Sequence, residues 1–179
     1  MNYMGGKQKQ SKHIIPVLNN FIKKHGIENY YEPFCGGFNV GAGVECEKLF
    51  ASDLSPTLIA LLSQAQSNPS QICTNSSKEK WNECKAKWYK LRQHQFKRLN
   101  SVPLAEIGAL EWLASYHCGG FPSGYGLEDG RNLYAERLSN LLKQASSPSF
   151  QKTKFTCQSY KDVSFSPNSV VYVDAPTFG

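Results

Sequence analysis

The sequence predicts an α/β fold, in which an open, doubly wound parallel sheet carries a mostly helical insert. Residues 29–62 read as strand, loop, helix, strand and helix, which is how a doubly wound sheet begins. Two short runs of high β-propensity return near the end, at residues 153–157 and 170–173. The strand patterns therefore bracket the insert, which spans residues 67–150.

The first elements follow from apolar spacing. Isoleucines, a leucine and a phenylalanine recur at helical spacing over residues 14–22. We expect Pro16 to lie in the first turn of this helix or to kink it, and Gly26 to end it. A buried strand is expected at residues 29–34 and another at 49–53.

Two helices are expected around the second strand. Residues 40–49 suit a helix whose first half is built from small residues. Ser55 and Pro56 open the next helix, because proline is favoured in the first helical turn. Leucines and an isoleucine between 58 and 62 form its apolar face.

The insert has its own pattern. A polar loop at 67–77 precedes a basic helix with interleaved aromatic residues at 78–98 and a second helix at 104–116. A glycine-rich loop at 117–130 then leads to a helix at 132–144.

Composition limits the class of protein. The 179 residues suffice for one domain with a core, and 20 Lys plus Arg against 14 Asp plus Glu give a net charge of +6. This charge fits a nucleic-acid partner, and it equally fits a basic protein without one.

Location and metal content are also suggested by composition. Six cysteines form no CxxC pair, so we expect reduced thiols, a cytoplasmic protein and no metal. The polar N-terminus is unlike a signal peptide, and no apolar run reaches the roughly 20 residues of a membrane span.

Two features point to a ligand at the carboxyl ends of the first strands. Residues 34–37, Phe-Cys-Gly-Gly, end a strand in glycines that let a ligand approach the backbone, although a plain turn explains them too. Asp53 ends the next strand, where an acid can bind ribose hydroxyls or simply cap a helix. The strand at 170–173 then delivers Asp174 to the same edge, unless Pro176 marks only a structural turn.

These motifs resemble those of Dam-type (D12 class) S-adenosylmethionine-dependent DNA adenine-N6 methyltransferases. Residues 3–7 resemble the N-terminal motif of the family, 32–37 its glycine loop, 52–53 its acidic ribose motif and 169–177 the strand leading to its catalytic Asp-Pro-Pro-Tyr. The order matches the subgroup whose target-recognition region lies between the cofactor-binding half and the catalytic motif.

The resemblance implies a Rossmann-like methyltransferase sheet and assigns roles to matching positions. It implies that the cofactor is contacted by Tyr3, Gly6, Lys7, Glu32, Phe34, Cys35, Gly36, Gly37, Asp53, Leu54, Ser159, Tyr160 and Asp174. It implies that the catalytic motif is Asp174, Ala175, Pro176 and Thr177. The implied reaction is site-specific transfer of a methyl group from S-adenosylmethionine to N6 of an adenine flipped out of double-stranded DNA.

The catalytic motif departs from the family pattern. It reads Asp-Ala-Pro-Thr, so Thr177 stands where the family has a tyrosine that stacks on the base. The alternative is therefore a non-catalytic protein that binds cofactor, DNA or a defence or regulatory protein.

The resemblance also divides the chain. Residues 1–66 and 151–179 correspond to the cofactor-binding and catalytic part, and 67–150 to the target-recognition region. The candidate DNA contacts are Lys85, Arg92, Phe121, Tyr125 and Arg131. The alternative for residues 78–98 is a solvated charged face with its aromatic residues packed inward.

The family continues with further strands and helices after its catalytic motif. If they are absent here, the strand at 170–173 becomes an exposed apolar edge. A partner chain or a second copy would then complete the sheet, or the chain is a remnant or fragment.

Overall fold

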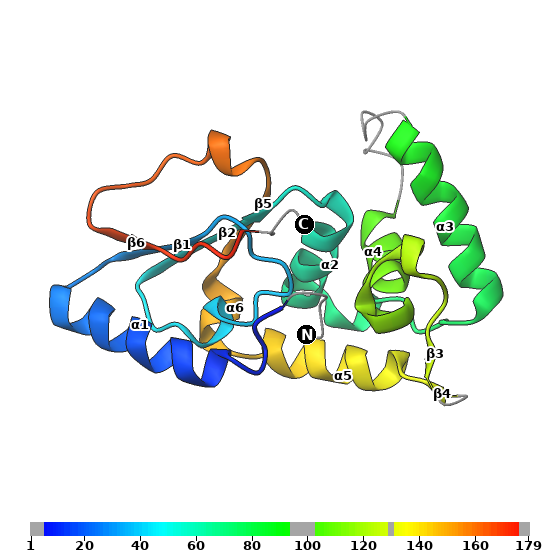
Figure 1. The fold of residues 1–179 in the computed structure, drawn as a ribbon, viewed down its shortest axis with the longest axis horizontal. Coiled ribbons are helices and arrows are strands. Elements are labelled where there is room, and N and C mark those ends of the chain that lie inside the picture. The colour runs from blue at the N-terminus through cyan, green and yellow to red at the C-terminus, as the bar shows by residue number, and fades with distance from the viewer. Residues whose placement is uncertain (1–5, 94–102, 129–130, 176–179) are drawn as a thin grey trace.

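A parallel sheet organises the computed structural model of the chain (Figure 1). The structure describes residues 6–93, 103–128 and 131–175. The sheet contains β1 (Asn29–Glu32), β2 (Lys48–Asp53), β5 (Lys154–Cys157) and β6 (Ser169–Val171), all paired in parallel in the order β5-β2-β1-β6. The first strand of the sheet thus lies between the second and the last, as in a doubly wound fold, which confirms the predicted fold class.

One face of the sheet forms the main core. Tyr30, Leu49 and Ala51 are buried there, with Phe155 beside them. The helix α1 (Ser11–His25) packs on this side through Ile14, Ile15, Leu18 and Ile22. In Figure 1 the segment 158–168, which contains the 3-10 turn η6 (Tyr160–Asp162), arcs over the opposite side.

The insert packs onto the sheet domain through α2 (Pro56–Ser67). Helix α4 (Leu104–Leu113) lies against α2, where Gly108 is required because a Cβ there would lie 2.1 Å from the carbonyl oxygen of Thr57. Helices α3 (Lys78–Gln93) and α5 (Tyr134–Ala145) complete this lobe. The hydrophobic core runs through both parts, so the proposed division at residues 66 and 150 stays a prediction.

Several predicted boundaries agree with the structure. Gly26 ends α1 in the left-handed conformation, with φ 62°. Ser55 caps α2 by accepting a hydrogen bond from the Leu58 amide, and Pro56 is its first residue. Pro16 lies in the second turn of α1 and not in the first, and the alternative that it kinks the helix stays a prediction.

The helix predicted at residues 40–49 is wrong. Only a short 3-10 turn, η1 (Gly41–Gly43), forms before the chain continues to β2. Glycine is a poor helix former, and Ser147 and Ser149, at the start of α6 (Pro148–Lys152), donate to the carbonyls of Ala42 and Val44 that helical hydrogen bonds would use.

The glycine-rich loop is more structured than predicted. It contains the 3-10 turns η4 (Tyr116–Cys118) and η5 (Phe121–Ser123) and the strand β3 (Leu127–Glu128), which pairs antiparallel with β4 (Arg131–Asn132). A further 3-10 turn, η2 (Pro69–Gln71), lies in the polar segment after α2.

Other sequence expectations concern cysteines, metals and membranes. All six cysteines are free. The described ranges contain no cluster of three or more His, Cys, Asp or Glu side chains arranged to hold a metal ion. They also contain no helix long and apolar enough to cross a membrane.

Candidate functional site

A cavity of about 530 Å³ lies at the carboxyl ends of β1 and β2. Strands β2 and β6 flank β1, so the chain connections diverge here, which is where open α/β sheets bind ligands. The lining residues are Gly6, Lys7, Glu32, Pro33, Phe34, Cys35, Gly36, Gly37, Asn39, Val40, Asp53, Leu54, Tyr160, Tyr172, Asp174 and Ala175. Most of the residues implicated by the sequence motifs are therefore brought together around one cavity.

The glycine loop is held close to the sheet by backbone hydrogen bonds. The amide of Cys35 donates to the carbonyl of Ser52 at 3.0 Å, which ties the loop to β2. Gly36 follows with φ 46°, a conformation that favours glycine. Its amide donates to Oδ2 of Asp53 at 3.1 Å, so loop and acid form one unit.

The carboxylate of Asp53 is fixed in orientation. Its Oδ1 accepts the amide of Ser55 at 3.0 Å, while Oδ2 accepts that of Gly36. Burial raises the pKa of Asp53, and these backbone hydrogen bonds act in the opposite direction. Each carboxylate oxygen offers two lone pairs, so Asp53 retains acceptor capacity toward the cavity.

An ion pair lies on the other side of the cavity. Nζ of Lys7 donates to Oδ1 and Oδ2 of Asp174 at 2.6 and 2.7 Å. Both side chains are about one-third exposed, at 34% and 28%. Lys7 thus contacts Asp174, the third residue after the end of β6, although 167 positions separate the two in the sequence.

Glu32 lies beneath the glycine loop and is buried. Its Oε2 accepts the hydroxyl of Tyr30 at 2.7 Å and the amide of Gly41 at 3.0 Å. Burial raises the pKa of Glu32 to about 8, against the lowering effect of these two hydrogen bonds. Glu32 is therefore mainly neutral at pH 7 and supports the loop from below.

An aromatic wall closes part of the cavity. The rings of Phe34 and Tyr160 lie 5.1 Å apart at 37°, and Tyr160 is exposed. Leu54 is exposed beside them. Ser159 caps η6 and does not line the cavity, in contrast to the expectation for this residue.

Three predicted site residues lie outside the described ranges: Tyr3, Pro176 and Thr177. Conversely, the sequence motifs missed Tyr172, which lines the cavity. The signal was available, because alternate residues of an extended segment point to the same side and Tyr172 lies two positions before Asp174.

Two of the candidate DNA contacts lie on α3. The aromatic stripe of this helix, Trp81 and Trp88, is buried, as the alternative interpretation of this segment expects. Nζ of Lys85 lies 4.7 Å above the ring of Trp81, and the guanidinium of Arg92 lies 5.2 Å above that of Trp88. The two cations therefore lie over the faces of the tryptophan rings, at distances typical of cation–π contacts.

The prediction that Phe121 reaches a DNA base was wrong for this conformation. Phe121 has 0% exposure and packs edge-on against Trp81 and Trp88. Tyr125 is similarly directed inward, since its ring contacts Trp81 and its hydroxyl donates to the carbonyl of Ser76 at 2.7 Å. Arg131 begins β4, and its side chain is outside the part that the structure describes.

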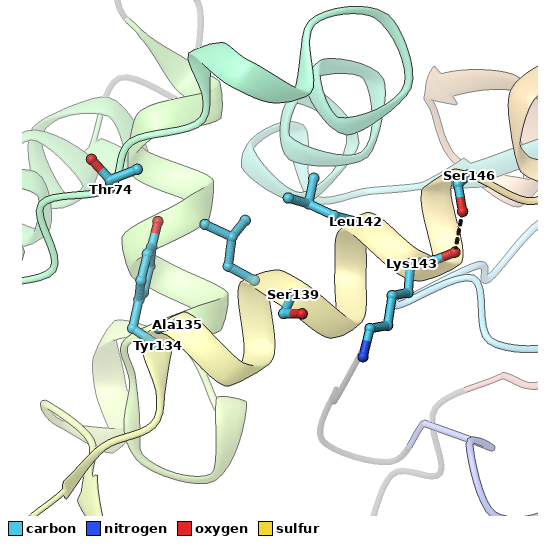
Figure 2. Close-up of a pocket in the computed structure, with 8 residues that line it drawn as sticks. Thr74, Tyr134, Ala135, Ser139, Leu142, Lys143 and Ser146 are labelled. Carbon is cyan, nitrogen blue, oxygen red and sulfur yellow. Dashed lines mark hydrogen bonds between the residues drawn. The ribbon is translucent and has the colours of Figure 1, made fainter.

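A second hollow lies along α5 (Figure 2). It has a volume of about 520 Å³ and is lined by Thr74, Tyr134, Ala135, Leu138, Ser139, Leu142, Lys143 and Ser146. The described residues that line it include none of those implicated by the motifs, and Lys143 is the one charged residue type among them. The cavity at the strand ends is therefore the better candidate site.

The fold and the cavity together define a class of protein. A glycine loop, an acid at the end of the neighbouring strand and a cavity at the switch point are typical of α/β proteins that bind a nucleotide-like ligand. Residues 3–176 match the family model for D12 class N6 adenine-specific DNA methyltransferases. The chain belongs to this family, as its motifs predicted.

A curated relative is similar over part of the chain. The type II methyltransferase M.FokI of Planomicrobium okeanokoites is 34% identical over 62 residues. The matched segment is 35% of this chain and 9% of that relative, so the similarity concerns a small part of a much longer protein.

Proposed function

We propose that this chain binds S-adenosylmethionine and transfers its methyl group to N6 of an adenine in double-stranded DNA. The observation that carries the proposal is the convergence of Asp174, Lys7, Asp53 and the glycine loop on one cavity. Its volume of about 530 Å³ lies within the range of ligand sites, roughly 300–1,000 Å³.

The residues present fit this cofactor. Asp53 offers oriented acceptor oxygens to ribose hydroxyls, and Phe34 with Tyr160 offers an apolar, aromatic surface to an adenine ring. The loop backbone at Gly36 and Gly37 allows close approach to the methionine part. When bound, S-adenosylmethionine would supply a methyl group on a sulfonium centre. Transfer would break the bond between sulfur and methyl, leave the neutral thioether S-adenosylhomocysteine and release one proton of the amine to solvent.

Asp174 is the proposed catalytic residue. An exocyclic adenine amine is a poor nucleophile, because its lone pair is delocalised into the ring. Acceptors for its two hydrogens localise that lone pair, and the Asp174 carboxylate and the Ala175 carbonyl are the proposed acceptors. Lys7 holds the carboxylate in place, so positioning and electrostatics provide the rate enhancement. The base leaves the duplex before it reaches this site.

The test measures transfer of labelled methyl groups from S-adenosylmethionine to genomic DNA that lacks adenine methylation, because such DNA contains many different candidate target sequences. We expect N6-methyladenine in the digested product, and none with Asp174→Ala. Absence of product from folded wild-type chain would contradict the enzymatic proposal.

The substituted motif favours a second function, binding without turnover. Thr177 replaces the tyrosine that the family uses against the base. Calorimetric binding of S-adenosylhomocysteine or DNA, together with no methylated product, would favour this second function over the first.

A further inference from the structure

The segment that follows the glycine loop is held by side chains from a distant part of the chain. Nε2 of Gln144 donates to the carbonyls of Gly37 and Phe38 at 2.8 and 2.7 Å. Oγ of Ser147 donates to the carbonyl of Ala42 at 2.8 Å. In the same way, Oγ of Ser149 donates to the carbonyl of Val44 at 2.6 Å, and Nζ of Lys152 donates to the carbonyl of Cys46 at 2.5 Å.

These side-chain donors take the place of the backbone donors that a helix would provide. A buried carbonyl needs a hydrogen-bond partner, and residues 37–46 form only a single 3-10 turn. The side chains at 144–152 supply partners along this segment in sequence order. The path of the loop that lines the cavity therefore depends on residues more than 100 positions away.

Gln144 contacts the loop at Phe38, where the backbone conformation is unfavourable for a residue other than glycine. Phe38 has φ 53° although it is not a glycine, a left-handed conformation that other residues rarely adopt. Its side chain is fully buried against Phe150 and Phe155. Gly37 and Asn39, on either side of Phe38, both line the cavity. A donor that bridges the carbonyls of Gly37 and Phe38 fixes the peptide between them.

Gln144 also belongs to the insert. It is carried by α5, and two turns earlier in the same helix Arg137 is buried and donates to the carbonyls of Leu113 and Ser115 at 3.0 and 2.9 Å. Leu141 packs into the core between them. Helix α5 therefore contacts two loops. Near its start, Arg137 holds the backbone just before the glycine-rich loop at 117–130, and near its end, Gln144 holds residues 37 and 38 beside the cavity.

We propose that Gln144 is a positioning residue for the cofactor loop, supplied to the cavity by the last helix of the insert. The proposal rests on the proposed function, in that the ligand of the cavity is taken to be S-adenosylmethionine or its product. Gln144 itself does not line the cavity, so it acts through the backbone of residues 37 and 38.

The experiment compares Gln144→Met with Gln66→Met. Gln66 is a matched control, because its Nε2 makes the same kind of contact with the carbonyls of Phe150, Gln151 and Thr153, which do not line the cavity. The measurements are the dissociation constant for S-adenosylhomocysteine by calorimetry, amide hydrogen exchange of residues 35–44 without ligand, and urea unfolding.

We expect Gln144→Met to raise the dissociation constant at least about tenfold and to speed exchange in residues 35–44, while Gln66→Met leaves both within about twofold. Gln144→Glu, which keeps the shape but points an acceptor at two carbonyls, should have a larger effect. Equal affinities and equal exchange in the Gln144 and Gln66 variants overturn the proposal. If the wild-type chain binds no S-adenosylhomocysteine, the cofactor assignment fails, and exchange alone still decides whether Gln144 positions the loop.

Discussion

Lys7 and Asp174 form a bidentate ion pair at one side of the candidate site, with Nζ 2.6 and 2.7 Å from the two carboxylate oxygens. This contact joins the segment before α1 to the third residue after the last strand. Asp174 therefore reaches the cavity with its orientation already set by a residue from the other end of the chain.

Replacing Lys7 by Met should impair function much more than stability. Both groups are about one-third exposed, so solvent screens the pair and its loss should lower the free energy of unfolding by less than about 1 kcal/mol. Methyl transfer should fall at least about tenfold, because Asp174 loses its fixed orientation. Lys7→Arg should retain more activity. Lys9→Met, which removes an exposed charge nearby, is the control, and an equal loss in that variant would show a general effect of charge.

Glu32 should make the protein less stable as the pH rises. Burial raises its pKa from 4.5 to about 8 in the folded chain. Below 4.5 the carboxyl is protonated in both states, so it imposes no penalty. Between about 4.5 and 8 the unfolded chain loses the proton first, and folded stability declines with increasing pH through this window.

Glu32→Gln should therefore flatten the dependence of unfolding free energy on pH, measured in urea from pH 5 to 8.5. A smaller slope should remain, because burial also raises the pKa of Glu111 from 4.5 to about 7. Glu111→Gln should remove part of this slope by itself. The variant with both substitutions should show the weakest dependence of unfolding free energy on pH. An unchanged slope in Glu32→Gln would contradict the assignment of Glu32 as a buried, mainly neutral acid.

The sheet and its edge could be predicted because their signals are local. β-propensity marks each strand, Asp53 and Asp174 come at or just after strand ends, and Ser55 with Pro56 marks the start of α2. Parallel pairing then brings these ends together. This is why motifs far apart in the sequence could be expected around one site.

The failures of prediction involve residues whose partners lie far away in the sequence. Nothing within residues 40–49 indicates that Ser147 and Ser149 will take their carbonyls. Phe121 looked available in a glycine-rich loop, but α3 places two tryptophans over it. Local patterns describe what a segment prefers alone, and these contacts form only when the insert packs onto the sheet.

Phe121→Ala should consequently affect stability. Removing a fully buried ring from beneath Trp81 and Trp88 should cost about 3–5 kcal/mol in unfolding free energy. Phe165→Ala is the matched comparison, because Phe165 is 47% exposed and makes one edge contact with Tyr31, worth about 1 kcal/mol. Urea unfolding measures both. A small stability loss with a large loss of DNA affinity in Phe121→Ala would restore the base-contact interpretation.

DNA binding should depend on Lys85 and Arg92, which lie two turns apart on α3. Two other lysines of this helix, Lys80 and Lys87, are already paired, since both contact Glu83. If Lys85 and Arg92 each neutralise one phosphate, replacing both by Met should lower the slope of log affinity against log salt by about 2. Fluorescence anisotropy with a labelled duplex measures this slope.

The control for this pair is Lys23→Met with Lys24→Met, which removes two exposed positive charges from the last turn of α1. It changes the net charge equally and leaves α3 intact, so its slope should stay close to that of the wild-type chain. The slope is proportional to the number of phosphates that the protein contacts, because each contact releases counterions. If only α3 makes these contacts, only the α3 variant changes the slope. Equal slopes in the two double variants would mean that the charge of the whole chain attracts DNA, and that α3 is a solvated basic face.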